Sequence, residues 1–227
     1  MNDTEKDKTD ILKRMASVVS HELRNPLAII SNSLYFVKTK LAAGGAALDP
    51  KIAKHIGIIE SEVKHSNDVI EEMLAFTRAR EMKPSRVAVN AALRDAASAY
   101  PFPPSVTHEV TEDPADPCVS ADPEALAYAL RSLLDNAVQA MPEGGAVKLA
   151  ASHEGRLAHL SVADGGPGLP DADGEKVFAP FYTTKPRGIG LGLTLARRYM
   201  EQLGGGAAAA NVPGGGARVT LSLPLSA

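Results

Sequence analysis

Two stretches with the hydrophobic spacing of an α-helix lie between Ile11 and about Arg80. In each of them apolar residues recur at steps of four and three, which places them along one narrow face of a helix. The glycine-containing segment LAAGGAALDP separates the stretches, and its Asp49 and Pro50 suit the start of a helix. The pattern therefore predicts a helical hairpin. Its apolar positions are Leu23, Leu27, Ile30, Leu34, Val37 and Leu41 in the first helix and Ile52, Ile56, Ile59, Val63, Ile70 and Met73 in the second.

A hairpin of this kind leaves much of its apolar face uncovered, because each helix has only one neighbour. Pairing two copies into a four-helix bundle covers that face. We therefore expect the chain to form a homodimer through residues 1–84.

The pattern changes after Lys83 and Pro84, where short β-branched runs alternate with helical stretches. This mixture is typical of an α+β layer domain, so we expect a second domain over residues 85–227, with a mixed sheet and helices. The order of elements does not repeat the βαβ unit, which disfavours a parallel Rossmann sheet. The predicted helices are Asn90–Tyr100, Asp122–Met141 with Asp122 as the cap, and Ile189–Leu203; the predicted strands are Val106–Val110, Cys118–Ser120, Ala146–Ser152, Leu157–Ala163 and Arg218–Leu223.

The composition is that of a globular protein, with 44% hydrophobic and 22% charged residues among 227. The formal net charge of -3 comes from mixed signs, so neither nucleic acid nor an acidic membrane surface is expected as the main partner. The single Cys118 cannot form an intrachain disulfide or a cysteine metal site, which fits a reducing compartment. No apolar run approaches the roughly 20 residues of a membrane helix. We expect a cytoplasmic segment without membrane contact, which leaves open a larger parent protein with a sensor upstream.

The sequence SHELRNPL (residues 20–27) carries candidate chemistry on the first predicted helix. His21 and Asn25 lie one turn apart and share a helix face. His21 lies about 200° around the helix from Leu23, so its imidazole is expected to point away from the apolar seam. Pro26 removes a backbone donor and predicts a local bend beside the histidine.

An exposed neutral histidine can attack phosphorus, because one ring nitrogen keeps a lone pair near neutral pH. Glu22 is placed to accept the proton of the other nitrogen, and Asn25 to orient a phosphate or a water molecule that hydrolyses phosphohistidine. The alternative is that these polar residues only keep an exposed helix soluble. The eight residues alone leave both interpretations open.

Four further stretches follow in the second domain: SLLDNAVQAM, DGGPGLP, VFAPFYTTK and GIGLGL. Asn136 on a predicted helix offers a carbonyl oxygen, a hard ligand for magnesium that is normally shared with phosphates and water. Asp164 ends a predicted strand and can accept a hydrogen bond from an adenine amino group, and Gly166 and Gly168 allow backbone to approach a flat ligand. Taken singly, a surface asparagine or a glycine-rich turn explains these stretches equally well. Their order indicates a nucleotide site.

The stretch GIGLGL lies just before a predicted helix, where free backbone N–H groups and the helix dipole favour phosphate oxygens. Its spacing differs from that of a Walker loop and of GxGxxG, which argues against those two nucleotide folds. Between the glycine-rich stretches, Phe178 and Phe181 are expected to anchor a lid-like segment, with packing in the core as the alternative. The candidate phosphate-binding residues are Gly188, Gly190 and Gly192, with Lys185 adding a positive charge.

Taken in order, the five stretches closely resemble the catalytic core of two-component sensor histidine kinases over nearly the whole chain. SHELRNPL resembles the phosphoacceptor box of that family and SLLDNAVQAM its asparagine box. DGGPGLP and GIGLGL resemble the two glycine boxes, and VFAPFYTTK the phenylalanine box. NAVQAMPEGG and FYTTK are most similar to the nitrogen-regulation type of sensor kinase.

The resemblance implies that residues 1–84 form the dimerisation and histidine phosphotransfer domain. It implies that residues 85–227 form an ATP-binding sandwich of the kind shared with Hsp90, MutL and gyrase, with ATP and Mg2+ as cofactors. His21 would then be autophosphorylated and pass its phosphoryl group to an aspartate of a response regulator receiver domain.

The resemblance also carries roles onto single residues. Glu22 would be the general base, and Asn25 would assist phosphoryl positioning and dephosphorylation. Asn136 would hold magnesium and Asp164 would recognise adenine. A large phosphatase share of the output is compatible with these roles.

Two positions depart from the family pattern. Ser132 stands where the asparagine box usually opens with a second asparagine, so one phosphate or metal contact is expected to be shortened or bridged by water. Ile189 stands where the second glycine box often has a small polar residue, which removes a lid hydrogen bond. These departures keep two alternatives open, a noncatalytic nucleotide-binding scaffold and an Hsp90-like ATPase in which His21 is incidental.

Overall fold

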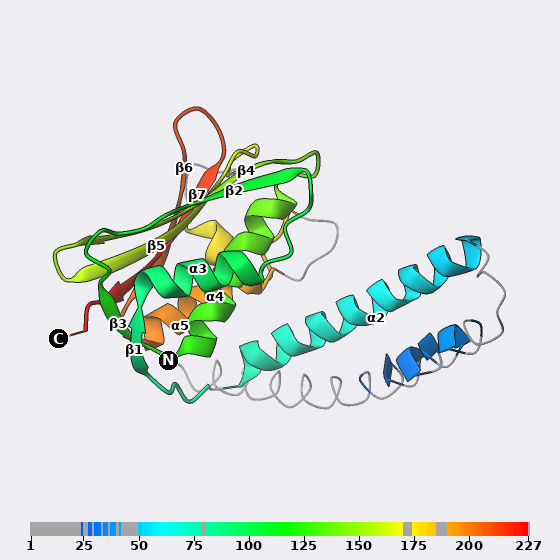
Figure 1. Cartoon of the computed structure of the whole chain (residues 1–227). Coiled ribbons are helices and arrows are strands. Elements are labelled where there is room, and N and C mark those ends of the chain that lie inside the picture. Colours follow the sequence, from blue (N-terminus) through cyan, green and yellow to red (C-terminus); the bar gives the residue numbers. More distant parts are fainter. Residues whose placement is uncertain are drawn as a thin grey trace. The chain divides into compact units, whose positions relative to one another are not determined.

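The computed structural model describes residues 50–78, 80–169, 174–184 and 190–226 and, between positions 24 and 41, residues 24, 27, 28, 30–32, 34, 35, 37–39 and 41. Contacts divide the chain into two compact units, Met1–Arg80 and Glu81–Ala227. Each unit is described by itself below. Figure 1 shows the long helix of the first unit and the sheet with its helices in the second.

The first unit is helical. The described residues between positions 24 and 41 are all helical, and α2 spans Pro50–Thr77. Ile56, Val63, Ile70 and Leu74 form a buried row along α2 at the spacing of a heptad seam. Leu74, rather than the predicted Met73, continues this row, because Met73 is only half-buried.

Ion pairs join the first helical segment to α2. Arg24 contacts the Glu71 carboxylate, and Lys38 Nζ lies 2.9 Å from Glu60 Oε1. The earlier residue of the first segment pairs with the later residue of α2, so the two helical stretches run antiparallel, as a hairpin requires. Both pairs are substantially exposed and each contributes only about 0–1 kcal/mol. They therefore set register more than stability.

The second unit is built on a five-stranded sheet with the order β2-β4-β5-β7-β6. The pair β2 and β4 is parallel, and the other neighbouring pairs are antiparallel, so the sheet is mixed as expected. A separate two-stranded sheet pairs β1 with β3. The strands are β1 (Ser85–Ala88), β2 (Val106–Thr111), β3 (Cys118–Ala121), β4 (Gly145–Glu154), β5 (Leu157–Asp164), β6 (Gly206–Asn211) and β7 (Ala217–Pro224).

Helices α3 (Val89–Ala99), α4 (Pro123–Gln139) and α5 (Gly192–Gln202) lie on one side of the five-stranded sheet (Figure 1). Alternate residues of the strands point into this core, which is why their hydrophobic pattern has a period of two. Asp122 caps α4, because its Oδ1 accepts the backbone N–H groups of Glu124 and Ala125, both at 3.0 Å. Buried residues at alternate positions of the three central strands include Val147, Leu149 and Ala151 on β4, Ala158, Leu160 and Val162 on β5, and Val219, Leu221 and Leu223 on β7.

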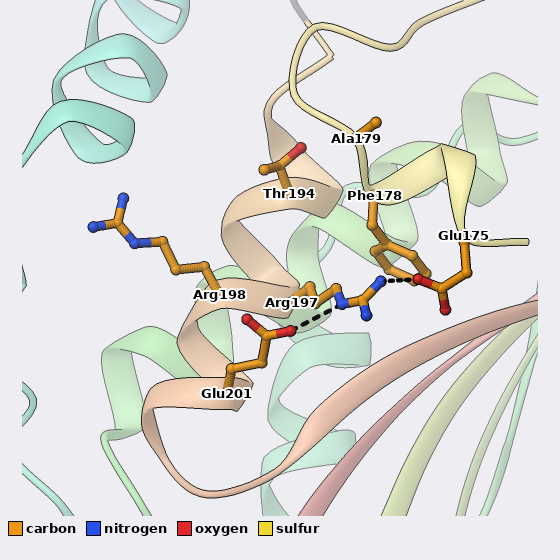
Figure 2. Close-up of a pocket in the computed structure, with 7 residues that line it drawn as sticks. All are labelled: Glu175, Phe178, Ala179, Thr194, Arg197, Arg198 and Glu201. Atoms are coloured by element: carbon orange, nitrogen blue, oxygen red, sulfur yellow. Dashed lines mark hydrogen bonds and ion pairs between the residues drawn. The ribbon is translucent and has the colours of Figure 1, made fainter. Parts of the chain in front are cut away.

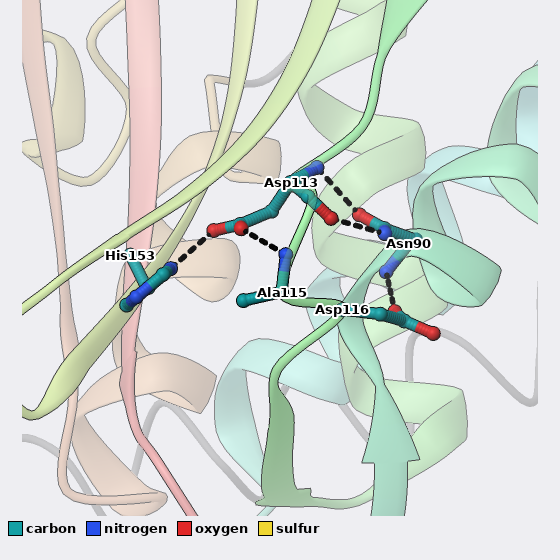
Figure 3. Close-up of polar contacts among 5 residues, drawn as sticks. All are labelled: Asn90, Asp113, Ala115, Asp116 and His153. Atoms are coloured by element: carbon teal, nitrogen blue, oxygen red, sulfur yellow. Dashed lines mark hydrogen bonds and ion pairs between the residues drawn. The ribbon is translucent and has the colours of Figure 1, made fainter.

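A polar cluster fastens the segment between β2 and β3 (Figure 3). The Asn90 side chain, at the start of α3, donates to the Asp113 carbonyl at 2.8 Å and accepts its N–H at 2.9 Å. The buried Asp113 carboxylate accepts the Ala115 N–H at 2.9 Å and lies 2.5 Å from His153 Nδ1 on β4. These bonds keep the pKa of Asp113 below its ordinary value, chiefly through His153 and then through Ala115.

In the part of the chain that the structure describes, no helix is long and apolar enough to cross a membrane.

Candidate functional site

Asp164 is the last residue of β5, next to β7 in the sheet. Its Oδ1 accepts the backbone N–H of Gly166 at 2.9 Å and that of Ala217 at 3.3 Å. These bonds fix the carboxylate at the end of the strand. Its Oδ2 makes no hydrogen bond within the described residues, which leaves an acceptor for the donor of a ligand. A carboxylate with one fixed oxygen can recognise an amino group, as the sequence predicted for adenine.

The end of α4 packs directly against the turn that follows Asp164. The backbone N–H of Gly165 donates to the Met141 sulfur at 3.3 Å, and Met141 is buried. A Cβ atom at Gly166 would lie 3.0 Å from the Ala140 carbonyl oxygen, closer than most side chains allow. The asparagine-box helix and the first glycine box therefore form one contact. No sequence signal marks Met141, because a thioether acceptor cannot be told from an ordinary core methionine.

Asn136 is half-buried on α4, one turn before this contact. Its backbone carbonyl oxygen accepts the backbone N–H of Ala140 at 3.0 Å. Its side-chain oxygen is a suitable hard donor for magnesium. No cluster of three or more His, Cys, Asp or Glu residues that could hold a metal exists within the described ranges. A magnesium ion at Asn136 would therefore take most of its ligands from nucleotide phosphates and water.

Ser132 lies one turn before Asn136 and is buried. Its hydroxyl donates to the Tyr128 carbonyl in its own helix at 3.0 Å. This local bond occupies the hydroxyl proton, as is common for serine inside helices. Ser132 thus has a structural use where the family pattern has an asparagine.

Gly168 adopts a φ of +82°, and a Cβ atom there would lie 2.6 Å from Asn211 Oδ1. The position therefore requires glycine. Asn211 is the last residue of β6, and its side chain bonds the backbone of Leu169, the residue after Gly168. Asn211 Oδ1 accepts the Leu169 N–H at 2.6 Å, and Asn211 Nδ2 donates to the Leu169 carbonyl at 3.5 Å. Sequence reasoning missed Asn211, which resembles an ordinary residue before the VPGGG turn.

A short 3-10 helix, η1 (Lys176–Phe178), leads into the phenylalanine box VFAPFYTTK, which begins at Val177. Phe178 is buried at 5% exposure, which fits both the expected anchor and the alternative of packing in the core. The same prediction is wrong for Phe181, which is 60% exposed and has a φ of +64°. Its backbone N–H donates to the Gly190 carbonyl at 3.1 Å.

Gly190 joins the phenylalanine box to the second glycine box. Its φ is +68°, and a Cβ atom would lie 2.4 Å from the Tyr182 carbonyl oxygen, so only glycine fits. Helix α5 begins at Gly192, after Gly190 and Leu191, although we expected the helix to begin at Ile189.

Tyr199 of α5 packs edge-on against Tyr128 of α4, with ring centroids 5.5 Å apart.

Contacts thus join the described parts of the boxes in two pairs: the asparagine box meets the first glycine box through Met141 and Ala140, and the phenylalanine box meets the second glycine box through Phe181 and Gly190. Helices α4 and α5, which carry parts of these boxes, pack against each other. The remaining predicted residues lie outside the described part of the chain. They are His21, Glu22, Asn25, Lys185 and Gly188, together with the departure Ile189.

The fold is an α+β domain that follows a helical hairpin in sequence, and two family models match parts of these two regions in the same order. Residues 121–227 match the family described as histidine kinase-, DNA gyrase B-, and HSP90-like ATPase. Residues 11–81 match the His Kinase A (phospho-acceptor) domain. The second domain is therefore of an ATP-binding type.

The similar proteins are sensor kinases. The chain is 31% identical over 224 residues to sensor histidine kinase ZraS of Escherichia coli O157:H7, covering 97% of this chain and 48% of that protein. Full-length ShkA in complex with AMPPNP superposes with a TM-score of 0.76 at 26% identity, over 94% of this chain and 46% of ShkA. Histidine kinase ThkA in complex with response regulator protein TrrA gives a TM-score of 0.69 at 26% identity, over 97% of this chain and 64% of that one.

The chain belongs to the two-component sensor histidine kinases and carries their phosphoacceptor and ATPase-type domains in order. It spans about half the length of the curated ZraS relative.

Proposed function

We propose that this chain is the catalytic core of a sensor kinase that transfers the γ-phosphoryl group of ATP to its own His21. The observation that carries the proposal is Asp164, whose carboxylate is fixed at the end of β5 by the N–H groups of Gly166 and Ala217. An adenine amino group would donate to Oδ2, and the Gly166–Gly168 turn would lie against the flat base.

The phosphates would extend toward the second glycine box. Gly190 and Gly192 precede or begin α5, whose free N–H groups and dipole favour anions. Lys185 and Gly188 would complete this phosphate site. Asn136 would hold a magnesium ion that neutralises phosphate charge when bound.

The reaction requires an in-line attack by a neutral imidazole. A ring nitrogen of His21 would form the N–P bond while the bond between the γ-phosphorus and the bridging oxygen breaks, and ADP leaves with the electron pair. Glu22 would take the proton from the other ring nitrogen. Asn25 would orient the phosphoryl group and later, in dephosphorylation, a water molecule.

Apolar side chains that one copy leaves exposed support a dimer. Leu27 and Leu34 are half-buried, whereas Ile30, Val37 and Leu41 on the first helical segment are exposed. Ile58 and Ile59 on α2 are exposed as well. A second copy would cover these residues in a four-helix bundle, because contiguous exposed apolar surface is unfavourable in water.

The partner would be an aspartate-bearing receiver domain of a response regulator, because a phosphohistidine is a reactive donor to a carboxylate. The helix face predicted around His21 would be its docking surface. The similar kinase ThkA was solved with a response regulator, which supports this class of partner.

ATP turnover by the His21→Ala variant separates this function from that of an Hsp90-like ATPase. We expect wild type with magnesium to form phosphohistidine and to label one receiver domain from a mixed panel. The variant is expected to bind ATP with unchanged Kd, to form no phosphohistidine and to label no receiver domain. Steady ATP hydrolysis in the variant, with no phosphohistidine in wild type, would contradict the proposal. Tight ATP binding without any transfer would support a noncatalytic scaffold instead.

A further inference from the structure

Arg197, on the second turn of α5, contacts residues of the phenylalanine box and of its own helix (Figure 2). Its Nη1 lies 2.5 Å from Glu175 Oε2, and its Nε lies 3.0 Å from Glu201 Oε1. Its guanidinium carbon lies 5.2 Å from the centre of the Phe178 ring. These residues line an open cavity of about 380 Å³. No motif in the sequence marks Arg197.

The contact with Glu175, two residues before the phenylalanine box, attaches the start of η1 to α5. Glu175 immediately precedes η1, and its carbonyl oxygen accepts the Phe178 N–H at 3.1 Å. The Phe178 ring is buried beneath the guanidinium. Arg197 therefore holds both the first turn of η1 and the anchor residue of the segment.

The planar guanidinium is needed for this combination. Two of its nitrogens contact different carboxylates while its central carbon lies over an aromatic ring, a combination that a lysine ammonium cannot reproduce. Glu175, and then Glu201, raise the pKa of Arg197, so the residue stays positively charged. Its side chain is 32% exposed, so water only partly screens these contacts.

The other end of the segment is bonded to the candidate phosphate site. The Phe181 N–H donates to the Gly190 carbonyl at 3.1 Å, and the Thr194 hydroxyl donates to the same carbonyl at 3.4 Å. Arg197 thus fixes the start of a segment whose end is bonded to Gly190.

We propose that Arg197 is a positioning residue for the triphosphate of ATP. It holds Glu175–Phe178 against α5, and this segment in turn sets the backbone of Gly190 at the phosphate end of the site. Asp164, at the adenine end, is bonded to Gly166 and Ala217 and makes no described contact with this group. The proposal rests on the proposed function for the identity of the ligand.

The test compares Arg197→Met, Arg197→Lys and a control, Arg94→Met, in the whole chain. Methionine keeps most of the length and apolar stem of arginine but makes neither ion pair. Arg94 forms a similar pair with Glu112 at 2.7 Å, away from the site residues, and both side chains are largely exposed. Calorimetry measures the Kd of ATP and of adenosine, and hydrogen exchange follows the Phe178 and Ala179 amides.

We expect Arg197→Met to weaken ATP binding about tenfold, the loss that follows from removing charge-assisted bonds. Adenosine binding should change less than about twofold, because it lacks the phosphates. Exchange at Phe178 and Ala179 should speed up. In autophosphorylation, KM for ATP should rise while kcat at saturating ATP stays within about twofold. Arg197→Lys should recover only part of the ATP affinity, and Arg94→Met should match wild type.

Equal loss of ATP and adenosine binding would overturn the proposal, because it would show a general structural role. Unchanged ATP affinity, or the same loss in Arg94→Met, would also overturn it. If Arg197→Met does not fold, Glu175→Gln removes the ion pair with Arg197 by changing its more exposed partner. This variant is expected to weaken ATP binding about threefold and to leave adenosine binding unchanged. Failure of wild type to label His21 would refute the proposed function alone, since the contrast between ATP and adenosine needs no phosphoryl transfer.

Discussion

Asn211 Oδ1 accepts the backbone N–H of Leu169 at 2.6 Å, and so joins the end of β6 to the residue that follows the first glycine box. The Asn211 amide also donates to the Leu169 carbonyl at 3.5 Å. A side chain far along the sequence thus closes the turn that would lie against adenine.

Replacing Asn211 should weaken nucleotide binding in proportion to the bonds lost. Asn211→Ala removes both contacts, and we expect the Kd for ATP to rise about five- to tenfold, or about 1 kcal/mol. Asn211→Asp keeps the acceptor for the Leu169 N–H and should lose less than about threefold. Calorimetric titration with ATP distinguishes the two. Equal losses in both variants would argue against the short bond as the main contact.

Asp164→Asn should reduce ATP affinity about 100-fold, or about 2.7 kcal/mol, because the site would present the wrong polarity. The amide oxygen must face the N–H groups of Gly166 and Ala217, so the NH2 group would face the adenine amino group, and two donors would meet. The measurement is ATP binding at constant salt, with circular dichroism as the folding control. Binding within about threefold of wild type would exclude Asp164 as the adenine acceptor.

Ser132→Ala should leave ATP binding and autophosphorylation within about twofold of wild type. The Ser132 hydroxyl already donates to the Tyr128 carbonyl inside α4, and such bonds contribute only about 0.5–1.5 kcal/mol. Initial rates at several ATP concentrations test this. A tenfold fall in rate with unchanged unfolding would show that Ser132 contacts a phosphate or metal after all.

The Asp113–His153 pair predicts a pH dependence of stability. Because the folded-state pKa of Asp113 is lowered, the folded protein binds fewer protons, and stability rises with pH across this range. The contribution is present above about pH 4, near the unfolded carboxyl pKa, and is lost as pH falls through the lower folded value. Asp113→Asn should flatten urea unfolding midpoints between about pH 3 and 5. Parallel pH profiles for variant and wild type would contradict this.

The strands β4, β5 and β7 could be predicted because their alternating residues face one core. β6 was missed, since GAAAAN has no β-branched residue and is a strand only because β7 pairs with it. β1 was missed because four residues show little periodicity, and its pairing with β3 supplies what the local sequence lacks.

The candidate site shows the same limit. Asp164, Gly166 and Gly168 follow one another closely, so a local pattern revealed them. Asn211 and Arg197 act through contacts made across the fold, and nothing near either residue in sequence marks its partner. Phe181 was misjudged because its left-handed backbone turns an apolar side chain outward.

If ATP bound at Asp164 phosphorylates His21, the transferred phosphoryl group must be found on that histidine. The chain is incubated with γ-labelled ATP and magnesium, and the labelled peptide is identified before and after acid treatment. We predict acid-labile, base-stable label on His21, absent from His21→Ala and strongly reduced in Asp164→Asn. Label on another residue, or equal labelling of His21→Ala, would contradict the account.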